Sequence, residues 1–161
     1  LAEEIRQVII HHQYHAYQIP RYNYILGKLT MGAGWYPDYQ TRLLKLGKAH
    51  YENPVHEVVA VDGERGTLEN HFIHYNYNDF EHFLQKQRKY VRYDARIMFD
   101  EGIKPKAQNY LLQPLRHFRW RFLELAGYKD GWHGFRLSAL MAWYEFRKYW
   151  ILRNLWQEQE S

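Results

Sequence analysis

The spacing of hydrophobic and polar residues changes near residue 78. Before that point, aromatic and branched residues recur over short runs that glycine and proline interrupt, a pattern typical of strands. A helix over residues 1–12 precedes these runs, residues 27–37 form a glycine-rich loop, and residues 62–66 form a turn. The predicted strands are residues 14–26, 39–46, 55–61 and 68–77.

After residue 78 the apolar residues recur at helical spacing. Asn78 can cap a first helix, with Glu81 at the position that completes a capping box, and Gly102 ends that helix. A second helix is expected over residues 111–126, and a third follows a turn at residues 127–134. The chain is therefore predicted to contain a few strands followed by three helices.

The length and composition suit one unit with a sizeable core, because the chain has 161 residues and is 46% hydrophobic. We predict an α/β fold, α+β within this chain: a catalytic portion at residues 1–77 and a helical extension at residues 78–161 packed on it. A chain that begins without methionine is expected to be part of a longer protein. The absence of cysteine excludes a disulfide scaffold and a thiolate metal site, and it suits the cytoplasm.

Positive charge is concentrated in the second half, where residues 86–153 carry 15 Lys and Arg against six Asp and Glu. Such a segment can meet nucleic acid, an anionic membrane or a phosphorylated substrate, or it can be a solvated helix surface. Tryptophans alternate with arginines in the same segment, which is typical of a surface at a lipid headgroup layer but also of a helical core. These tryptophans are Trp120, Trp132, Trp143, Trp150 and Trp156.

Two positions in the first half are candidates for chemistry. Glu57 follows His56 at the head of a predicted strand, where a carboxylate can act as general base and a histidine can orient it or bind phosphate. Arg42 interrupts an apolar run, which indicates a buried partner, an anionic ligand, or a strand-edge arginine in solvent. A surface role is the alternative for each.

Five segments in order resemble the C-terminal half of family 2 glycosyltransferases, and the similarity is closest to the bacterial branch that includes lipopolysaccharide-core glucosyltransferases. The resemblance covers almost the whole chain, although no single segment is specific. The segments are YQIPRYNY at residues 17–24, GWYPDYQTRL at 34–43, VHE at 55–57, IHY at 73–75 and GYKDGWHGF at 127–135.

The resemblance implies the C-terminal part of a type A glycosyltransferase fold, whose N-terminal half carries the nucleotide site and an aspartate motif for a divalent metal, Mg or Mn. Glu57 would be the base of the reaction. The residues expected to bind substrate are Trp35 and Tyr36, as a platform for a sugar ring, and Gln40 and Arg42, near the donor diphosphate. His74 would be an additional contact to the metal or to a phosphate.

The predicted function is therefore inverting transfer of a sugar from a nucleotide-diphosphosugar to an envelope glycan or a lipid-linked acceptor. The chain is expected to be inactive without the missing half, and to contact the inner face of the cell membrane peripherally. The alternatives are a basic nucleic-acid-binding module and a non-catalytic scaffold. The chain has no recognisable RNA-binding signature, and nucleic acid is not the expected partner.

Overall fold

A computed structural model describes residues 1–11, 13–52 and 58–159. It combines helices with antiparallel sheet, so the predicted α+β class is confirmed. Within the described residues, no helix is long and apolar enough to cross a bilayer.

The chain divides into two compact units, each built from two segments. The sheet unit contains residues 1–23 and 36–74, and the helical unit contains residues 24–35 and 75–161. The predicted division after residue 77 thus differs from this one, because the loop 24–35 and the end of the last strand belong with the helices. Each unit is described by itself.

The central strand of the sheet is β1 (Ala16–Ile25). β3 (Tyr39–Leu44) pairs with it in antiparallel register, with Pro20 opposite Tyr39, and β6 (Arg65–Thr67) pairs with it in parallel register. β2 (Lys28–Thr30) and β7 (Phe72–Tyr77) also pair with β1. β1 and β3 lie within predicted strand regions, whereas β2 falls in the predicted loop at residues 27–37 and β6 overlaps the predicted turn at residues 62–66.

One side of the sheet unit is closed by the first helix, α1 (Ala2–His11). Ile5 and Val8 of this helix pack on a buried cluster made of Tyr17, Ile19 and Leu68. Tyr17 and Ile19 of β1 therefore point to the same side of the strand, as a period of two requires.

A separate hairpin extends from the sheet unit. It consists of β4 (Ala49–Glu52) and β5 (Val58–Val61), which pair in antiparallel register with Glu52 opposite Val58. The sequence pattern missed β4, because its residues are mostly polar and exposed and carry no alternation of core positions.

The prediction of a strand from residue 68 was wrong for its first four residues, since β7 begins only at Phe72. The Glu4 carboxylate of α1 accepts hydrogen bonds from the backbone N–H groups of Glu69 and Asn70, at 2.6 and 3.0 Å. These groups are occupied by a side chain and so do not join the ladder.

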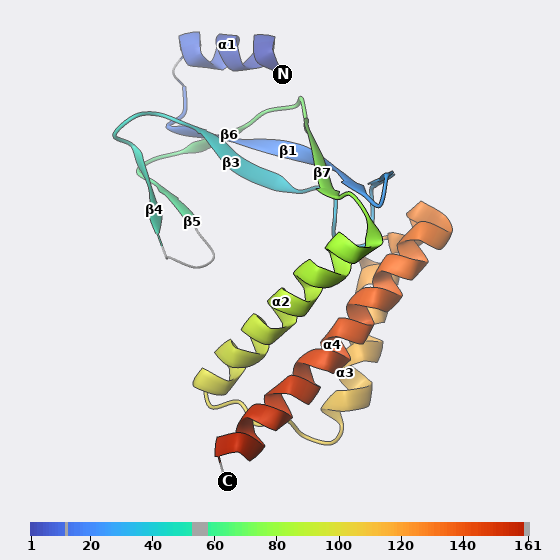
Figure 1. Ribbon diagram of the computed structural model, residues 1–161. Helices are drawn as coiled ribbons and strands as arrows, with labels where there is room; N and C mark the ends of the chain where they lie inside the picture. Colours follow the sequence, from blue (N-terminus) through green and yellow to red (C-terminus); the bar gives the residue numbers. More distant parts are fainter. Residues whose placement is uncertain (12, 53–57, 160–161) are drawn as a thin grey trace. The chain divides into compact units, whose positions relative to one another are not determined.

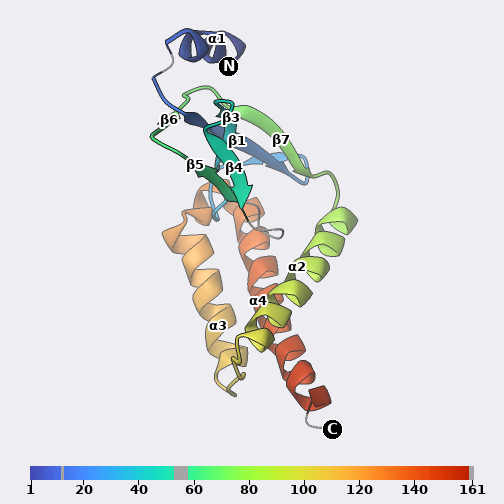
Figure 2. The same cartoon turned by 90° about the vertical axis from the view of Figure 1, so that its left-hand side faces the viewer.

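The helical unit contains α2 (Phe80–Asp100), α3 (Asn109–Arg119) and α4 (Gly131–Gln159). α4 lies between α2 and α3 and contacts both (Figures 1 and 2). A π-helical turn, η1 (Trp120–Glu124), continues α3, and a 3₁₀ turn, η2 (Gly127–Asp130), leads into α4. The second and third predicted helices are therefore present, but the second changes to π geometry at residue 120 and the third begins at residue 131.

The predicted cap of α2 was wrong by one residue. Asp79, not Asn78, is the N-cap, and its carboxylate accepts from the backbone N–H of His82 at 2.7 Å. The apolar stripe that the sequence predicted does face inward, since Phe83, Val91 and Ala95 are all buried.

Candidate functional site

A pocket of 220 Å³ opens on the sheet unit, between β3 and the strands that follow it. Two residues predicted to bind substrate, Gln40 and Arg42, line it together. The remaining lining residues are Tyr39, Thr41, Tyr51, Val59 and Arg65. We call this the strand pocket.

Among the described residues that line the strand pocket there are two arginines and no carboxylate, so this part of the lining is positively charged. Arg42 is exposed and, within the described part of the chain, forms no hydrogen bond or ion pair. Arg65 donates from Nη2 to the Val59 carbonyl at 3.0 Å, which holds its guanidinium beside the pocket. Two exposed guanidinium groups are suited to an anionic ligand such as a phosphate.

Gln40 is held in place by a half-buried carboxylate on the segment before β3. The Asp38 Oδ1 atom accepts from Gln40 Nε2 at 2.8 Å. Its Oδ2 atom accepts from Arg21 Nε at 2.9 Å and from Asn23 Nδ2 at 2.8 Å. Asp38 thereby ties the edge of the strand pocket to β1.

Burial alone would raise the pKa of Asp38. Hydrogen bonds from Asn23, Arg21 and Gln40, together with the positive charge of Arg21, outweigh that effect and hold the pKa below its ordinary value. The carboxylate is therefore ionised at neutral pH and keeps its acceptor role.

Tyr36 belongs to an aromatic cluster on the sheet unit. Its hydroxyl hydrogen-bonds His71 Nε2 at 3.1 Å, and the His71 ring stacks on Tyr22 with centroids 3.9 Å apart. The rings of this stack are half-buried, and His71 and Tyr22 were not among the predicted residues. Trp35, the other half of the predicted platform, lies in the helical unit, where it packs edge-on against Tyr77 at 5.9 Å.

His74, the predicted additional metal or phosphate contact, hydrogen-bonds Asn23 Oδ1 through Nδ1 at 2.8 Å. In residues 1–11, 13–52 and 58–159, no group of three or more His, Cys, Asp or Glu side chains is arranged to hold a metal ion. The expected binding of Mg or Mn stays a prediction from the resemblance.

The predicted catalytic pair, His56 and Glu57, lies outside the described residues. Their role as orienting group and general base rests on the sequence. Strand β5, which begins at the next residue, contributes Val59 to the strand pocket.

Neither Arg65 nor Tyr51 was predicted to belong to this site. Arg65 stands in a segment whose aspartate and glycines indicate a turn, and Tyr51 lies in the strand that the pattern missed. Only the pairing of β4 with β5 and of β6 with β1 reveals that they share a pocket with Arg42.

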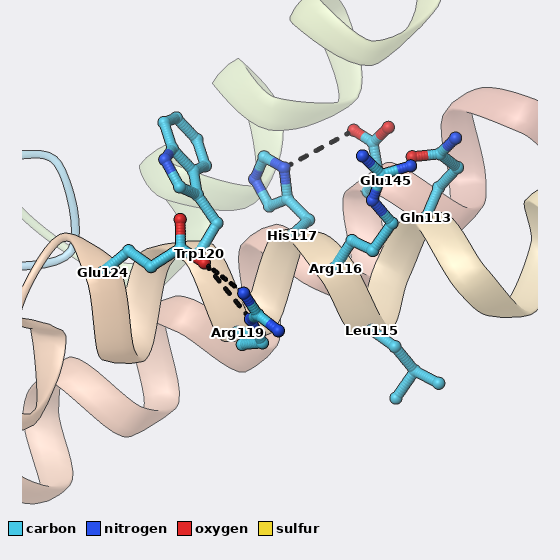
Figure 3. A pocket seen from close by; sticks show the side chains of 8 residues that line it. All are labelled: Gln113, Leu115, Arg116, His117, Arg119, Trp120, Glu124 and Glu145. Atoms are coloured by element: carbon cyan, nitrogen blue, oxygen red, sulfur yellow. Dashed lines mark hydrogen bonds and ion pairs between the residues drawn. The ribbon is translucent and has the colours of Figure 1, made fainter.

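A second pocket, of 520 Å³, lies in the helical unit along α3 and η1. In Figure 3 the His117 ring lies between the Trp120 indole and the Glu145 carboxylate, whereas Leu115 points away from both. The other lining residues are Gln113, Arg116, Arg119 and Glu124. We call this the helical pocket, and π-helical turns such as the one at its edge are frequent at functional sites.

Two residues that line the helical pocket, His117 and Glu145, interact with charged side chains beside it. Arg121 donates from Nε to His117 Nε2 at 2.8 Å, so the proton of the neutral ring sits on Nδ1, 3.9 Å from Glu145 Oε2. Lys148 donates to the same Glu145 oxygen at 2.8 Å. Burial, and next the charge of Arg121, lower the pKa of His117 and keep it neutral at pH 7.

No protein-family model matches the chain, and no solved structure matches it. The resemblance to family 2 glycosyltransferases therefore rests on the sequence segments alone.

Proposed function

We propose that this chain supplies the acceptor side of an inverting glycosyltransferase, which moves a sugar from a nucleotide-diphosphosugar to an envelope glycan or a lipid-linked acceptor at the inner face of the cell membrane. The strand pocket is the observation that supports the proposal best. It combines the guanidinium groups of Arg42 and Arg65 with the amide of Gln40, and none of the described residues that line it carries a carboxylate.

Sugar transfer needs positive charge where the nucleotide diphosphate departs. An arginine fork can bind two phosphate oxygens at once, and charges fixed before the reaction stabilise the leaving group without reorganisation. Arg42 and Arg65 are proposed to fill this role. Asp38 supports it indirectly by holding Gln40 at the edge of the pocket.

The rings around this site suit a sugar. Tyr39 and Tyr51 line the strand pocket, and Tyr36 with its stacked partners His71 and Tyr22 forms a second aromatic surface on the same unit. Aromatic faces pack on the apolar side of a sugar ring while their polar tips hydrogen-bond its hydroxyl groups. These rings are proposed to position the acceptor.

Glu57 is proposed as the base that removes the proton from the acceptor hydroxyl as the new glycosidic bond forms. General-base catalysis contributes about 10²–10⁴-fold to a rate, so Glu57→Gln in the full-length protein is expected to reduce turnover at least about 10²-fold while donor binding persists. Transfer of radiolabelled sugar from nucleotide sugars to isolated membranes measures turnover. Turnover close to that of the wild type would remove Glu57 from this role.

Arg42→Gln tests the strand pocket in the same assay. Loss of a diphosphate contact is expected to lower kcat/KM at least about tenfold, because a charge-assisted hydrogen bond is worth about 1.5–3 kcal/mol. Arg92→Gln, which removes an exposed arginine from α2, is the matched control and should leave kcat/KM unchanged. Equal activity of the two variants would contradict the proposed role of the pocket.

A further inference from the structure

The outward side of α3 and of the π-helical turn after it is apolar. Leu111, Leu112, Leu115 and Leu123, which we call the leucine face, recur at helical spacing and are 49–65% exposed. The exposed side of a helix in a globular protein is normally its polar side, and contiguous exposed apolar residues mark an interaction surface. In the described part of the chain nothing covers the leucine face.

The opposite side of α3 packs firmly on α4. Tyr110 meets Phe146 with ring centroids 6.2 Å apart, and Phe118 meets Phe135 at 5.5 Å. These aromatic contacts at both ends fix the rotation of α3 about its axis. The leucines are therefore exposed by the packing of the helix and not by its fraying.

The charges beside the leucine face are positive. Arg119 is paired with Glu124, at 2.9 Å between Nη2 and Oε1, so these two charges compensate each other. Arg116 is exposed, and among residues 1–11, 13–52 and 58–159 its guanidinium has no hydrogen-bond or ion-pair partner. It shares the helical pocket with Trp120, whose ring is itself exposed.

We propose that the leucine face docks on an anionic lipid bilayer. The leucines would lie at the boundary between headgroups and acyl chains, while Arg116, which follows Leu115 in the helix, binds a headgroup phosphate. Leucines with an arginine beside them are suited to this depth, because arginine can bury its methylene stem and keep its charge at the phosphates.

A lipid surface fits this face better than a second copy of the chain. Two-fold pairing through the leucine face would bring the positively charged Arg116 side chains of both copies toward each other, whereas anionic headgroups neutralise them. The sequence predicted a basic, tryptophan-rich membrane contact, but it did not single out the leucines of α3. Trp156 is not part of such a surface, since it packs on Phe99 at 4.7 Å and donates to the Ile103 carbonyl.

The inference goes beyond the proposed transfer reaction and can fail independently of it, because lipid vesicles contain neither sugar donor nor sugar acceptor. The test is flotation of the purified chain with vesicles of phosphatidylcholine alone or mixed equally with phosphatidylglycerol, at low salt. The wild type is expected to float with the mixed vesicles. The triple variant Leu111→Ser, Leu112→Ser and Leu115→Ser is expected to lower the partition constant at least about tenfold, and Arg116→Gln to lower it about fivefold, for mixed vesicles only.

Two matched variants control for loss of any exposed apolar residue or charge. Ile73→Ser changes an exposed isoleucine of the sheet unit, and Arg92→Gln changes an exposed arginine of α2; both should float like the wild type. Since the leucines are exposed, the triple variant should keep its far-UV circular dichroism.

Three outcomes would overturn the proposal: a wild type that does not float with the mixed vesicles, a folded triple variant that floats as well as the wild type, or sedimentation that shows a dimer dependent on the leucine face without lipid. The last result would assign the face to a second copy of the chain.

Discussion

Asp38 is the residue on which the edge of the strand pocket depends. A single carboxylate accepts hydrogen bonds from Arg21, Asn23 and Gln40, which brings together residues from β1 and β3. Removing one partner from such a network leaves several donors without an acceptor, which costs more than the hydrogen bonds themselves contribute.

Asp38→Asn is expected to lower the free energy of unfolding by about 1–3 kcal/mol at pH 7, because the side chain keeps its size but turns one acceptor into a donor that faces other donors. Urea unfolding followed by circular dichroism measures the change. Asp62→Asn is the matched control, since Asp62 is an exposed carboxylate of the same unit with a single side-chain donor, Lys48. A similar loss in both variants would contradict the special role of Asp38.

The same substitution has a pH signature with a definite sign. The pKa of Asp38 is lower in the folded protein than the ordinary value of 3.8, so its contribution is fully present well above pH 3.8 and is lost as the pH falls through the folded value. The difference in stability between the wild type and Asp38→Asn should therefore shrink below about pH 4. A difference that stays constant from pH 7 to acid would show that the carboxylate charge is not its source.

Individual site residues could be predicted from the sequence only where a local pattern marks them. Arg42 stands out because apolar residues follow it. Gln40 stands out because it lies in a segment that resembles family 2 glycosyltransferases. Arg65 and His71 carry no such mark, since each acquires its neighbours only through pairing of strands far apart in sequence.

At the scale of elements, the long periodic segments were predictable and the short polar ones were not. β1 and α2 bury a regular set of side chains, so their patterns identify them. β4 buries none of its side chains, and the segment before β7 is diverted by the Glu4 carboxylate. Such tertiary effects leave no periodic trace.

The start of α2 gives a prediction at this scale. Asp79→Ala should lower the free energy of unfolding by about 0.5–2 kcal/mol, because it removes the side-chain acceptor of the His82 N–H. Asn78→Ala, one residue earlier, should have almost no effect. Thermal unfolding of the two variants measures both changes. A larger loss of stability in Asn78→Ala than in Asp79→Ala would show that Asn78 is the cap, as the sequence predicted.

The transition from α3 into a π-helical turn is a further feature that no propensity indicates. The turn carries the Trp120 and Arg121 side chains, and Arg121 reaches the carbonyl of Ala33 at 2.6 Å as well as His117. Its guanidinium is half-buried, and burial lowers its pKa from the ordinary value. The bond to the Ala33 carbonyl connects the irregular turn to the segment of residues 24–35.

For the whole molecule, the α+β class followed from the change of hydrophobic period, but the division into units did not. The helical unit takes residues 24–35 from the middle of the sheet region, and Asp130 secures them by accepting from the N–H groups of Met31 and Gly32. The prediction used a single boundary after residue 77, and a single boundary cannot define a unit that consists of two separate segments.

The central claim about function is that the strand pocket receives the diphosphate of a sugar donor. Its most direct test is a titration of the isotope-labelled chain with inorganic pyrophosphate, followed by amide chemical shifts. We expect saturable shifts at Thr41, Arg42 and Arg65, which disappear in Arg42→Gln and persist in Arg92→Gln. Shifts that do not saturate, that lie elsewhere in the chain, or that survive in Arg42→Gln would contradict the account.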